Sequence, residues 1–224
     1  MAQRKLAAIM FSDIVGYSSL LEKDDKKAFD TRKKNHRIHK RLIKKFNGRV
    51  LKEMESGVLA SFSSIIDAVM CSLSIQKATQ DIGISIRIGI HQGEVIFEKK
   101  DVLGDGVNIA SRIQNVINTS GIIISEKVYS DIKNKEGLEI ESLGPQTLKG
   151  VDSSVRIYKV SCHDESLLDF TIDTGELVRP LSFRRSTIVI GIIVIAILAY
   201  AIYYFIPKAT PSSESKKRVL VLLP

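Results

Sequence analysis

The chain has 224 residues, enough for one domain with a sizeable core and an additional segment, but too few for two full domains. Hydrophobic residues make up 44% of it and charged residues 26%, which excludes a chain that is disordered or membrane-embedded over most of its length. The two cysteines, Cys71 and Cys162, have neither metal-ligand nor redox spacing. We therefore expect reduced thiols, with Cys71 buried.

The net charge of +8 is concentrated in a basic run between Lys26 and Lys45, where lysines and arginines recur at helical spacing. Such a run is typical of a solvated outer helix surface, and it also suits polyphosphates or anionic lipid headgroups. It lacks the series of aromatic residues that stacking on nucleic acid bases requires. We therefore predict no nucleic acid partner.

The first predicted element is an apolar run from Leu6 to Ser12, typical of a strand that ends at a carboxylate. A helical period follows from Asp24 to Phe46, and Asn47-Gly48 is a stop and turn signal. The polar residues Met1 to Lys5 do not form a signal peptide, so we expect this part of the chain to stay in the cytoplasm.

Strand and helix patterns then alternate along the chain. The predicted elements are, in order, strands Arg49–Glu53 and Val58–Phe62, an amphipathic helix from Ile65 to Gln76, strands Ser85–His91 and Glu94–Glu98, a helix from Gly106 to Val116, and strands Ile122–Ser125 and Arg156–Val160. Gln92-Gly93 between two of these strands predicts a hairpin. Together the elements predict an α+β domain in which helices flank a mostly antiparallel sheet.

Residues 187–206 read TIVIGIIVIAILAYAIYYFI and carry no charge over about the 20 residues that cross a bilayer. A buried helix of a globular protein is the alternative, but a surface that is apolar all round is costly outside a membrane or a large core. We predict one transmembrane helix in the inner or plasma membrane. The basic residues on its two sides do not decide its orientation.

The predicted organisation has four parts. They are the α+β domain at 1–162, a juxtamembrane linker at 163–185, the transmembrane helix at 186–206 and a short extracytoplasmic tail at 207–224. A strand-like apolar run begins at Arg218 and stops at Pro224, so we expect the sequence to be the front part of a longer architecture.

The first candidate site residue is Asp13, in the segment FSDIVGYS, where a strand ends and Gly16 permits close approach by a ligand. Carboxylate and carbonyl oxygens suit Mg²⁺, which binds through one or two carboxylates plus substrate phosphates. An aspartate after a strand is also common as a helix cap or turn residue, and Asp13 alone leaves that alternative open.

Two further segments carry candidate residues. In DVLGDGVNIASRI, which begins at Asp101, Asn108 and Arg112 are four residues apart and share one face of the predicted helix. Arginine offers a bidentate fork to phosphate oxygens and asparagine a neutral donor, although both are equally typical of an exposed helix surface. In LKEMESGVLASF, Lys52 near the end of a strand suits a base edge or a phosphate, and by itself is typical of a surface lysine.

Taken together, the motifs FSDIVGYS, LKEMESGVLASF, IRIGIHQGEV, DVLGDGVNIASRI and TLKGVDSSVRIYKV resemble, in order and spacing, those of class III adenylate and guanylate cyclase domains. The resemblance covers roughly residues 5–161. It implies a ferredoxin-like fold with two composite active sites at a head-to-tail dimer interface, formed with a second copy or with another cyclase domain.

The resemblance also implies individual roles. Asp13 and the backbone carbonyl of Ile14 match metal ligands, so the expected cofactor is Mg²⁺ or Mn²⁺. Lys52 and Asp101 match the pair that reads adenine, which makes ATP the expected substrate. Asn108 matches the residue that orients the ribose. Arg112 matches the residue that stabilises charge on the phosphorus in the transition state.

One position departs from the family pattern, because Glu55-Ser56 stands where the family usually has Gly-Asp. The resemblance therefore implies that a serine stands in place of the second metal-binding aspartate, and Glu55, Glu53 or a water could replace the missing ligand. Two functions stay open. The domain is either an adenylate cyclase with a weakened metal site, or a catalytically deficient partner that complements a complete cyclase or binds nucleotide as a regulatory module.

Overall fold

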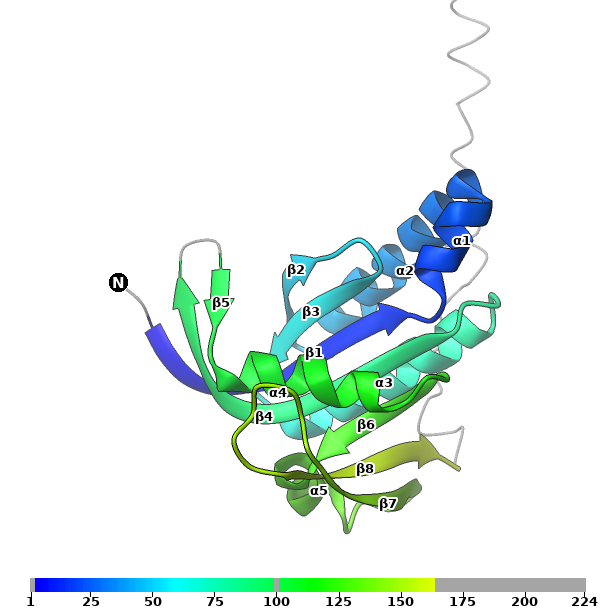
Figure 1. Cartoon of the computed structure of the whole chain (residues 1–224). Helices are drawn as coiled ribbons and strands as arrows, with labels where there is room; N and C mark the ends of the chain where they lie inside the picture. Colours follow the sequence, from blue (N-terminus) through cyan, green and yellow to red (C-terminus); the bar gives the residue numbers. More distant parts are fainter. Residues whose placement is uncertain (1–2, 99–100, 164–224) are drawn as a thin grey trace, which may run out of the picture. The chain divides into compact units, whose positions relative to one another are not determined.

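The computed structural model describes residues 3–98 and 101–163, and its elements alternate along the chain (Figure 1). In order they are β1 Gln3–Ile14, α1 Tyr17–Lys23, α2 Asp25–Lys45, β2 Arg49–Glu53, β3 Gly57–Phe62, α3 Ile65–Gln80, β4 Ile86–Glu98, β5 Asp101–Leu103, α4 Asp105–Ile113, a short 3-10 turn η1 Gln114–Val116, β6 Gly121–Ser125, α5 Glu126–Ile132, β7 Leu138–Gln146 and β8 Val155–Cys162.

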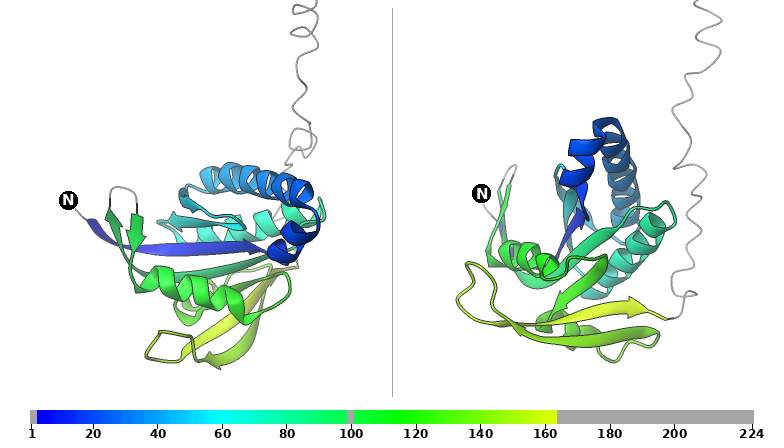
Figure 2. Two further views of the ribbon diagram at one scale, coloured as in Figure 1. Left: turned by 45° about the horizontal axis from the view of Figure 1, so that its top comes forward. Right: turned by 45° about the vertical axis from the view of Figure 1, so that its right-hand side comes forward.

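All eight strands form one sheet in the order β2-β3-β1-β4-β6-β8-β7, with β5 paired to β4. β4 and β6 pair in parallel and the other neighbours pair antiparallel. The prediction of a mostly antiparallel sheet flanked by helices is confirmed. Figure 2 shows α2 and α3 on one side of the sheet and α4 on the other.

The helix predicted from Asp24 to Phe46 is confirmed as α2. The Asp24 side chain accepts a hydrogen bond from the Lys27 backbone N–H at 2.9 Å, which satisfies one of the free donors at the helix start. The helix ends before Asn47, whose φ of 56° lies in the left-handed region that asparagine tolerates. The Asn47-Gly48 signal therefore stops the helix as its sequence predicts.

The hairpin predicted at Gln92-Gly93 is wrong, because β4 continues unbroken from Ile86 to Glu98. Gly93 pairs with Ala7 inside the sheet. A Cβ at Gly93 would lie 2.8 Å from the Cα of Gly106 in α4. This glycine therefore permits the close approach of a helix backbone, which is the other common reason for a glycine inside a strand.

Two faces of the sheet bury different amounts of apolar surface. The face under α2 and α3 holds a large core that includes Ile38, Val69, Phe62 and Ile90. The face under α4 holds two smaller clusters, one around Ile9 and one around Ile113 of α4, and each has more partly buried than fully buried apolar residues; those beside the first cluster are Phe11, Leu51, Met54, Phe97, Val102 and Val107. The α4 face is thus the less completely covered one.

Four elements lie outside the sequence predictions: α1, β5, α5 and β7. Three of them are seven residues or shorter, so they carry too few periodic positions for a clear pattern.

Cys71 is buried as expected. No helix among residues 3–98 and 101–163 is long and apolar enough to cross a membrane. The predicted transmembrane segment at 186–206 lies outside the described residues.

Candidate nucleotide site

Asp13 lies near the end of β1, opposite Gly57 of β3 and Arg87 of β4. Side chains directly opposite one another in an antiparallel sheet point to the same face. Ile9 and Phe11, two and four residues before Asp13, pack in the α4 cluster, so Asp13 also points to the α4 face. Its side chain is 19% exposed.

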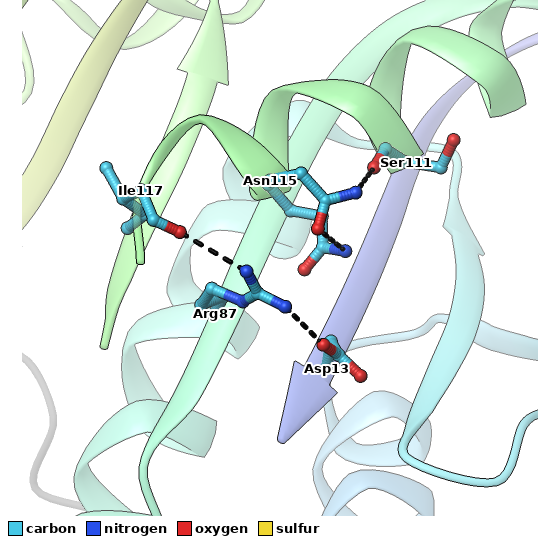
Figure 3. Close-up of polar contacts among 6 residues, drawn as sticks. Asp13, Arg87, Ser111, Asn115 and Ile117 are labelled. Carbon is cyan, nitrogen blue, oxygen red and sulfur yellow. Dashed lines mark hydrogen bonds and ion pairs between the residues drawn. The ribbon is translucent and has the colours of Figure 1, made fainter. Parts of the chain in front are cut away.

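Arg87 is the main partner of Asp13. Its Nη2 donates to Asp13 Oδ2 at 2.5 Å, and its Nη1 donates to the backbone carbonyl of Ile117 at 3.4 Å (Figure 3). The guanidinium therefore spans from the carboxylate to the segment that follows α4. The sequence interpretation missed Arg87, although IRIGIHQGEV was one of the motifs used; an arginine in an otherwise apolar strand was the available signal.

The turn between β2 and β3 lies against the end of β1. The backbone N–H of Ile14 donates to the Ser56 carbonyl at 2.8 Å, and the Met54 N–H donates to the Gly57 carbonyl at 2.9 Å. Ser56, half-buried, is thus next to the Asp13 strand end. The two strands predicted on either side of this turn are confirmed, and the turn places the backbone of Ser56 beside the end of β1.

The two glutamates of this turn differ in their surroundings. Glu53 points to the other face of the sheet, where its carboxylate lies 2.7 Å from Lys40 Nζ and 3.2 Å from His36 Nδ1 of α2. Glu55 is exposed. Within the described ranges, no group of three or more His, Cys, Asp and Glu side chains could hold a metal ion together.

A bulge in β2 sets the direction of Lys52. The register with β3 shifts between Val50 and Lys52, so that Lys52 pairs with Leu59. Leu59 packs in the α4 cluster, so the bulge places Lys52 on the same face as Asp13. Without the extra residue, strict alternation would turn Lys52 toward α2. Bulges often redirect a side chain next to a functional site.

Asp101, Asn108 and Arg112 come from one continuous stretch, because β5 leads directly into α4. Asp101 begins β5 and pairs with Glu98 of β4. β5 also contacts β2, the strand that carries Lys52. The side chains of Lys52, Asn108 and Arg112 are all exposed. The fold therefore places β2 beside β5, which leads into α4, so the elements that carry four predicted site residues are neighbours.

The fifth residue, Asp13, lies apart from Asp101. Asp13 pairs with Arg87 and Asp101 with Glu98, at opposite ends of β4. At about 3.3 Å per residue, the strand between them spans up to roughly 35 Å. Among the described residues, no hydrogen bond or ion pair links Asp13 to Lys52, Asn108 or Arg112. Within one chain, Asp13 and Asp101 therefore occupy distant positions along β4.

A buried polar network lies behind Asp13 on the α2 side. His39 Nδ1 donates to the Asn35 carbonyl at 2.9 Å, so its Nε2 accepts from the Ser12 hydroxyl at 2.9 Å. Burial lowers the pKa of His39 to about 4; the hydrogen bond to Asn35 opposes this and the neighbouring His36 adds to it. His39 is therefore neutral near pH 7 and ties α2 to the end of β1.

Comparison with known proteins identifies the domain. The family model described as "Adenylate and Guanylate cyclase catalytic domain" matches residues 1–162. The chain belongs to this family, the class III nucleotide cyclase domains. The family that the sequence motifs predicted is confirmed.

Individual relatives agree with this assignment. The chain is 31% identical over 173 residues to "Putative adenylate cyclase 3" of Rhizobium meliloti (strain 1021), covering 73% of this chain and 30% of that protein. It therefore spans about a third of the length of this curated relative.

Solved structures have the same fold. The adenylate/guanylate cyclase/hydrolase from Silicibacter pomeroyi matches with a TM-score of 0.67 and 29% identity, over 72% of this chain and 99% of that one. The adenylyl cyclase CyaB from P. aeruginosa matches with a TM-score of 0.66 and 24% identity, over 73% of this chain and 97% of that one. Because the first is matched over nearly its whole length, a domain of this size folds on its own.

Class III cyclases generally use Mg²⁺ or Mn²⁺, and the residues near Asp13 fit one such ion. Arg87 binds Oδ2 of Asp13, and Oδ1 has no hydrogen bond from the described residues. This oxygen, a backbone carbonyl of Ile14 and substrate phosphates are the ligand types that Mg²⁺ accepts. Asp13 is not part of any group of three or more His, Cys, Asp and Glu side chains that could hold a metal ion within the described ranges.

Proposed function

We propose that this domain is an adenylate cyclase that converts ATP to 3′,5′-cyclic AMP and pyrophosphate in intracellular signalling. The observation that carries the proposal is the β2 bulge, which directs Lys52 to the face of Asp13. It supplies a base-reading lysine on the side of the sheet that also carries β5 and α4. The names of the relatives include both adenylate and guanylate cyclases, so the choice of base rests on the residues.

Lys52 and Asp101 select adenine by hydrogen-bond polarity. A lysine donates to a ring nitrogen, and an aspartate accepts from the exocyclic amine. Guanine presents the opposite polarity at these positions and would leave both groups unpaired. A buried polar group without a partner costs about 1–3 kcal/mol, which favours ATP over GTP.

In the proposed reaction the ribose 3′-oxygen attacks the α-phosphorus in line, and the bond from this phosphorus to the pyrophosphate oxygen breaks. Asn108 orients the ribose, and Arg112 donates to the phosphate oxygens as charge develops on them. The proton of the 3′-hydroxyl leaves to water or to a substrate phosphate. A bound Mg²⁺ or Mn²⁺ would polarise the 3′-hydroxyl and shield the polyphosphate.

The active form we propose is a dimer, either of two copies or with another cyclase domain. Asp13 of one subunit would face Lys52, Asp101, Asn108 and Arg112 of the other. Two observations support this arrangement: one chain leaves Asp13 apart from Asp101, and six apolar residues of the α4 face, among them Phe11 and Phe97, are only partly buried. An incompletely covered apolar face is typical of an interaction surface.

We further propose that the metal site is weakened. Ser56 offers a neutral hydroxyl in place of a carboxylate, Glu53 is engaged with α2, and Arg87 already binds Asp13. These observations also favour the second candidate function, in which this chain lends Lys52, Asp101, Asn108 and Arg112 to a partner that holds the metals. Glu55, exposed in the same turn, is the remaining candidate for a substitute ligand.

For location, we propose a single-pass protein of the inner or plasma membrane with the cyclase domain in the cytoplasm. The support is the uncharged stretch at 187–206, which is long enough to span a bilayer.

The deciding experiment measures cyclic nucleotide formation by residues 1–163 with ATP or GTP and with Mg²⁺ or Mn²⁺. We expect activity with ATP, a loss of about 100-fold or more for Asp13→Ala, and a gain of about tenfold or more for Ser56→Asp. Activity that Asp13→Ala leaves unchanged would contradict the cyclase proposal. Activity absent from the native domain but restored by Ser56→Asp would favour the second function.

Mixing experiments test the shared site. Asp13→Ala and Arg112→Ala proteins, each inactive alone, should regain activity when mixed, because one of the two composite sites is then intact. For the second function, the native domain is mixed with a metal-competent cyclase that lacks its adenine-reading lysine. No gain in either mixture would show that the residues do not act across a dimer.

A further inference from the structure

Helix α2 carries an unusual share of the charge. It contains ten lysines and arginines against two aspartates, a net charge of +8 that equals the net charge of the whole chain. The rest of the chain is therefore balanced between basic and acidic residues. The charge of this protein is in effect the charge of one helix.

The cations gather on one side of this helix, away from the core. The α2 basic face consists of Lys26, Lys27, Lys33, Lys34, Arg41 and Lys44, all of them exposed. At 3.6 residues per turn these six positions fall within an arc of about 120°. The opposite side of the helix packs into the core through Ala28, Ile38 and Leu42. Figure 2 shows α2 along the outside of the domain.

These six side chains are not neutralised within the domain. Other cations of α2 have partners: Lys40 pairs with Glu53, and Arg32 lies over the ring of Phe29 at 5.1 Å. None of the six in the α2 basic face takes part in an ion pair in the part of the chain that the structure describes. Asp30 is the one acidic residue within the arc.

Such crowding costs stability. Like charges three or four residues apart on a helix repel one another. A solvated surface does not require this concentration, and basic and acidic residues are equal in number over the rest of the sequence. An anionic partner would relieve the repulsion along the whole helix.

The shape of the α2 basic face favours an extended partner. Lys26, Lys27 and Lys34 line one hollow together with Asp24 and Asp30, but the six cations are spread along a helix about 30 Å long, so a single small anion could not contact all of them. The run lacks the series of aromatic side chains that single-stranded nucleic acid requires. A broad anionic surface can meet all six side chains at once.

We propose that the α2 basic face docks the domain onto an anionic phospholipid surface. Each lysine or arginine near such a surface adds about 1 kcal/mol, or roughly fivefold, to the binding constant. This inference goes beyond the cyclase proposal and does not depend on it.

The proposed membrane segment adds a second argument. The 23 residues at 164–186 separate the described domain from residue 187, and a chain of this length spans at most roughly 80 Å. If residues 187–206 span the bilayer, the domain stays close to lipid, where even a weak surface affinity is effective. Docking through α2 would leave the α4 face, on the opposite side of the sheet, free for nucleotide and partner.

Vesicle co-sedimentation of residues 1–163 tests the proposal without an activity assay. Vesicles of phosphatidylcholine with 30% phosphatidylserine are compared with pure phosphatidylcholine at 150 mM salt. We expect binding only to the anionic vesicles. The quadruple variant Lys26→Gln, Lys33→Gln, Lys34→Gln, Lys44→Gln should reduce the binding constant at least tenfold, and glutamine keeps the helix propensity.

The matched control removes the same charge elsewhere, with Lys133→Gln, Lys135→Gln, Lys149→Gln and Lys159→Gln, all exposed residues outside α2. We expect less than about a threefold loss. Equal losses in the two variants, or equal binding to neutral vesicles, would overturn the proposal. So would tighter binding of duplex DNA or polyglutamate than of anionic vesicles at the same salt, because the partner would then be another class of macromolecule.

Discussion

The two faces of the sheet differ in how completely they are sealed. Under α2 and α3, large side chains such as Phe62 and Ile90 are almost fully buried, and the polar groups of His39 and Ser12 bind each other. Under α4, the two clusters are small, Phe11 and Phe97 are only partly buried, and the side chains of Lys52, Asn108 and Arg112 are exposed.

The difference indicates that the two faces of the sheet have different roles, one in stability and one in binding. The sealed face provides the stability of the domain, because burial of apolar surface is the largest favourable contribution to folding. The α4 face buries less apolar surface, and its charged and polar groups stay accessible to a ligand or a partner. Changes on the first face should therefore affect folding, and changes on the second should affect binding.

The largest expected effect on stability comes from comparing two phenylalanines, one on each face of the sheet. Phe62→Ala on the sealed face should lower the free energy of unfolding by about 3–5 kcal/mol, because the ring is 2% exposed and leaves a cavity. Phe11→Ala on the α4 face should cost less than about 2 kcal/mol and weaken dimerisation. Urea unfolding and analytical ultracentrifugation of residues 1–163 measure the two effects. Equal losses of stability would remove the distinction between the faces.

Acid should destabilise the sealed face. Between pH 6.5 and pH 4 the unfolded chain binds a proton at His39 and the folded chain does not, so stability falls as pH falls. With the pKa lowered to about 4, the loss by pH 4 is roughly 3 kcal/mol. His39→Gln should have a shallower dependence on pH in denaturant titrations. The same slope for both proteins would mean that His39 is protonated in the fold.

Gly93→Ala should disturb the contact between β4 and α4. The added Cβ would lie 2.8 Å from the Cα of Gly106, so α4 must shift, at a cost of about 1–3 kcal/mol. Because α4 carries Asn108 and Arg112, nucleotide affinity should fall as well. The control is Gly83→Ala. Gly83 has φ +72°, and a Cβ added there would have no non-neighbouring atom within 4 Å, so the variant should lose about 1 kcal/mol of stability and keep its nucleotide affinity. Equal nucleotide affinities for Gly93→Ala and Gly83→Ala would indicate that the position of α4 does not affect nucleotide binding.

The smallest effect distinguishes two ion pairs that both join β1 to β4. Asp13 and Arg87 are 19% and 17% exposed, and we expect a coupling of about 1–2 kcal/mol from a double-mutant cycle with Asp13→Asn and Arg87→Met. Arg4 and Glu94 are 68% and 65% exposed at 3.2 Å, and their coupling should stay below about 0.5 kcal/mol. A coupling no larger for the inner pair would argue against Arg87 as the residue that holds the Asp13 carboxylate.

Local patterns predicted much of the fold correctly. β2 begins and ends at the predicted residues, and the helix predicted from Asp24 to Phe46 has its caps at those two residues. These predictions succeed because alternation, helical period and capping depend on residues close in the chain. The same reasoning fails at Gly93. A glycine is needed there because the backbone of Gly106, which is distant in sequence, lies too close for a side chain.

The sequence alone determined the family motifs, the carboxylate at the end of the first strand, the serine at position 56 and the concentration of charge in one helix. Only the tertiary structure decided that Arg87 binds Asp13, that Glu53 points to α2 and that a bulge turns Lys52 to the face of Asp13. These three results depend on which strands pair and in which register. A shift of one residue reverses the face of every side chain beyond it, and a short apolar strand does not encode that shift.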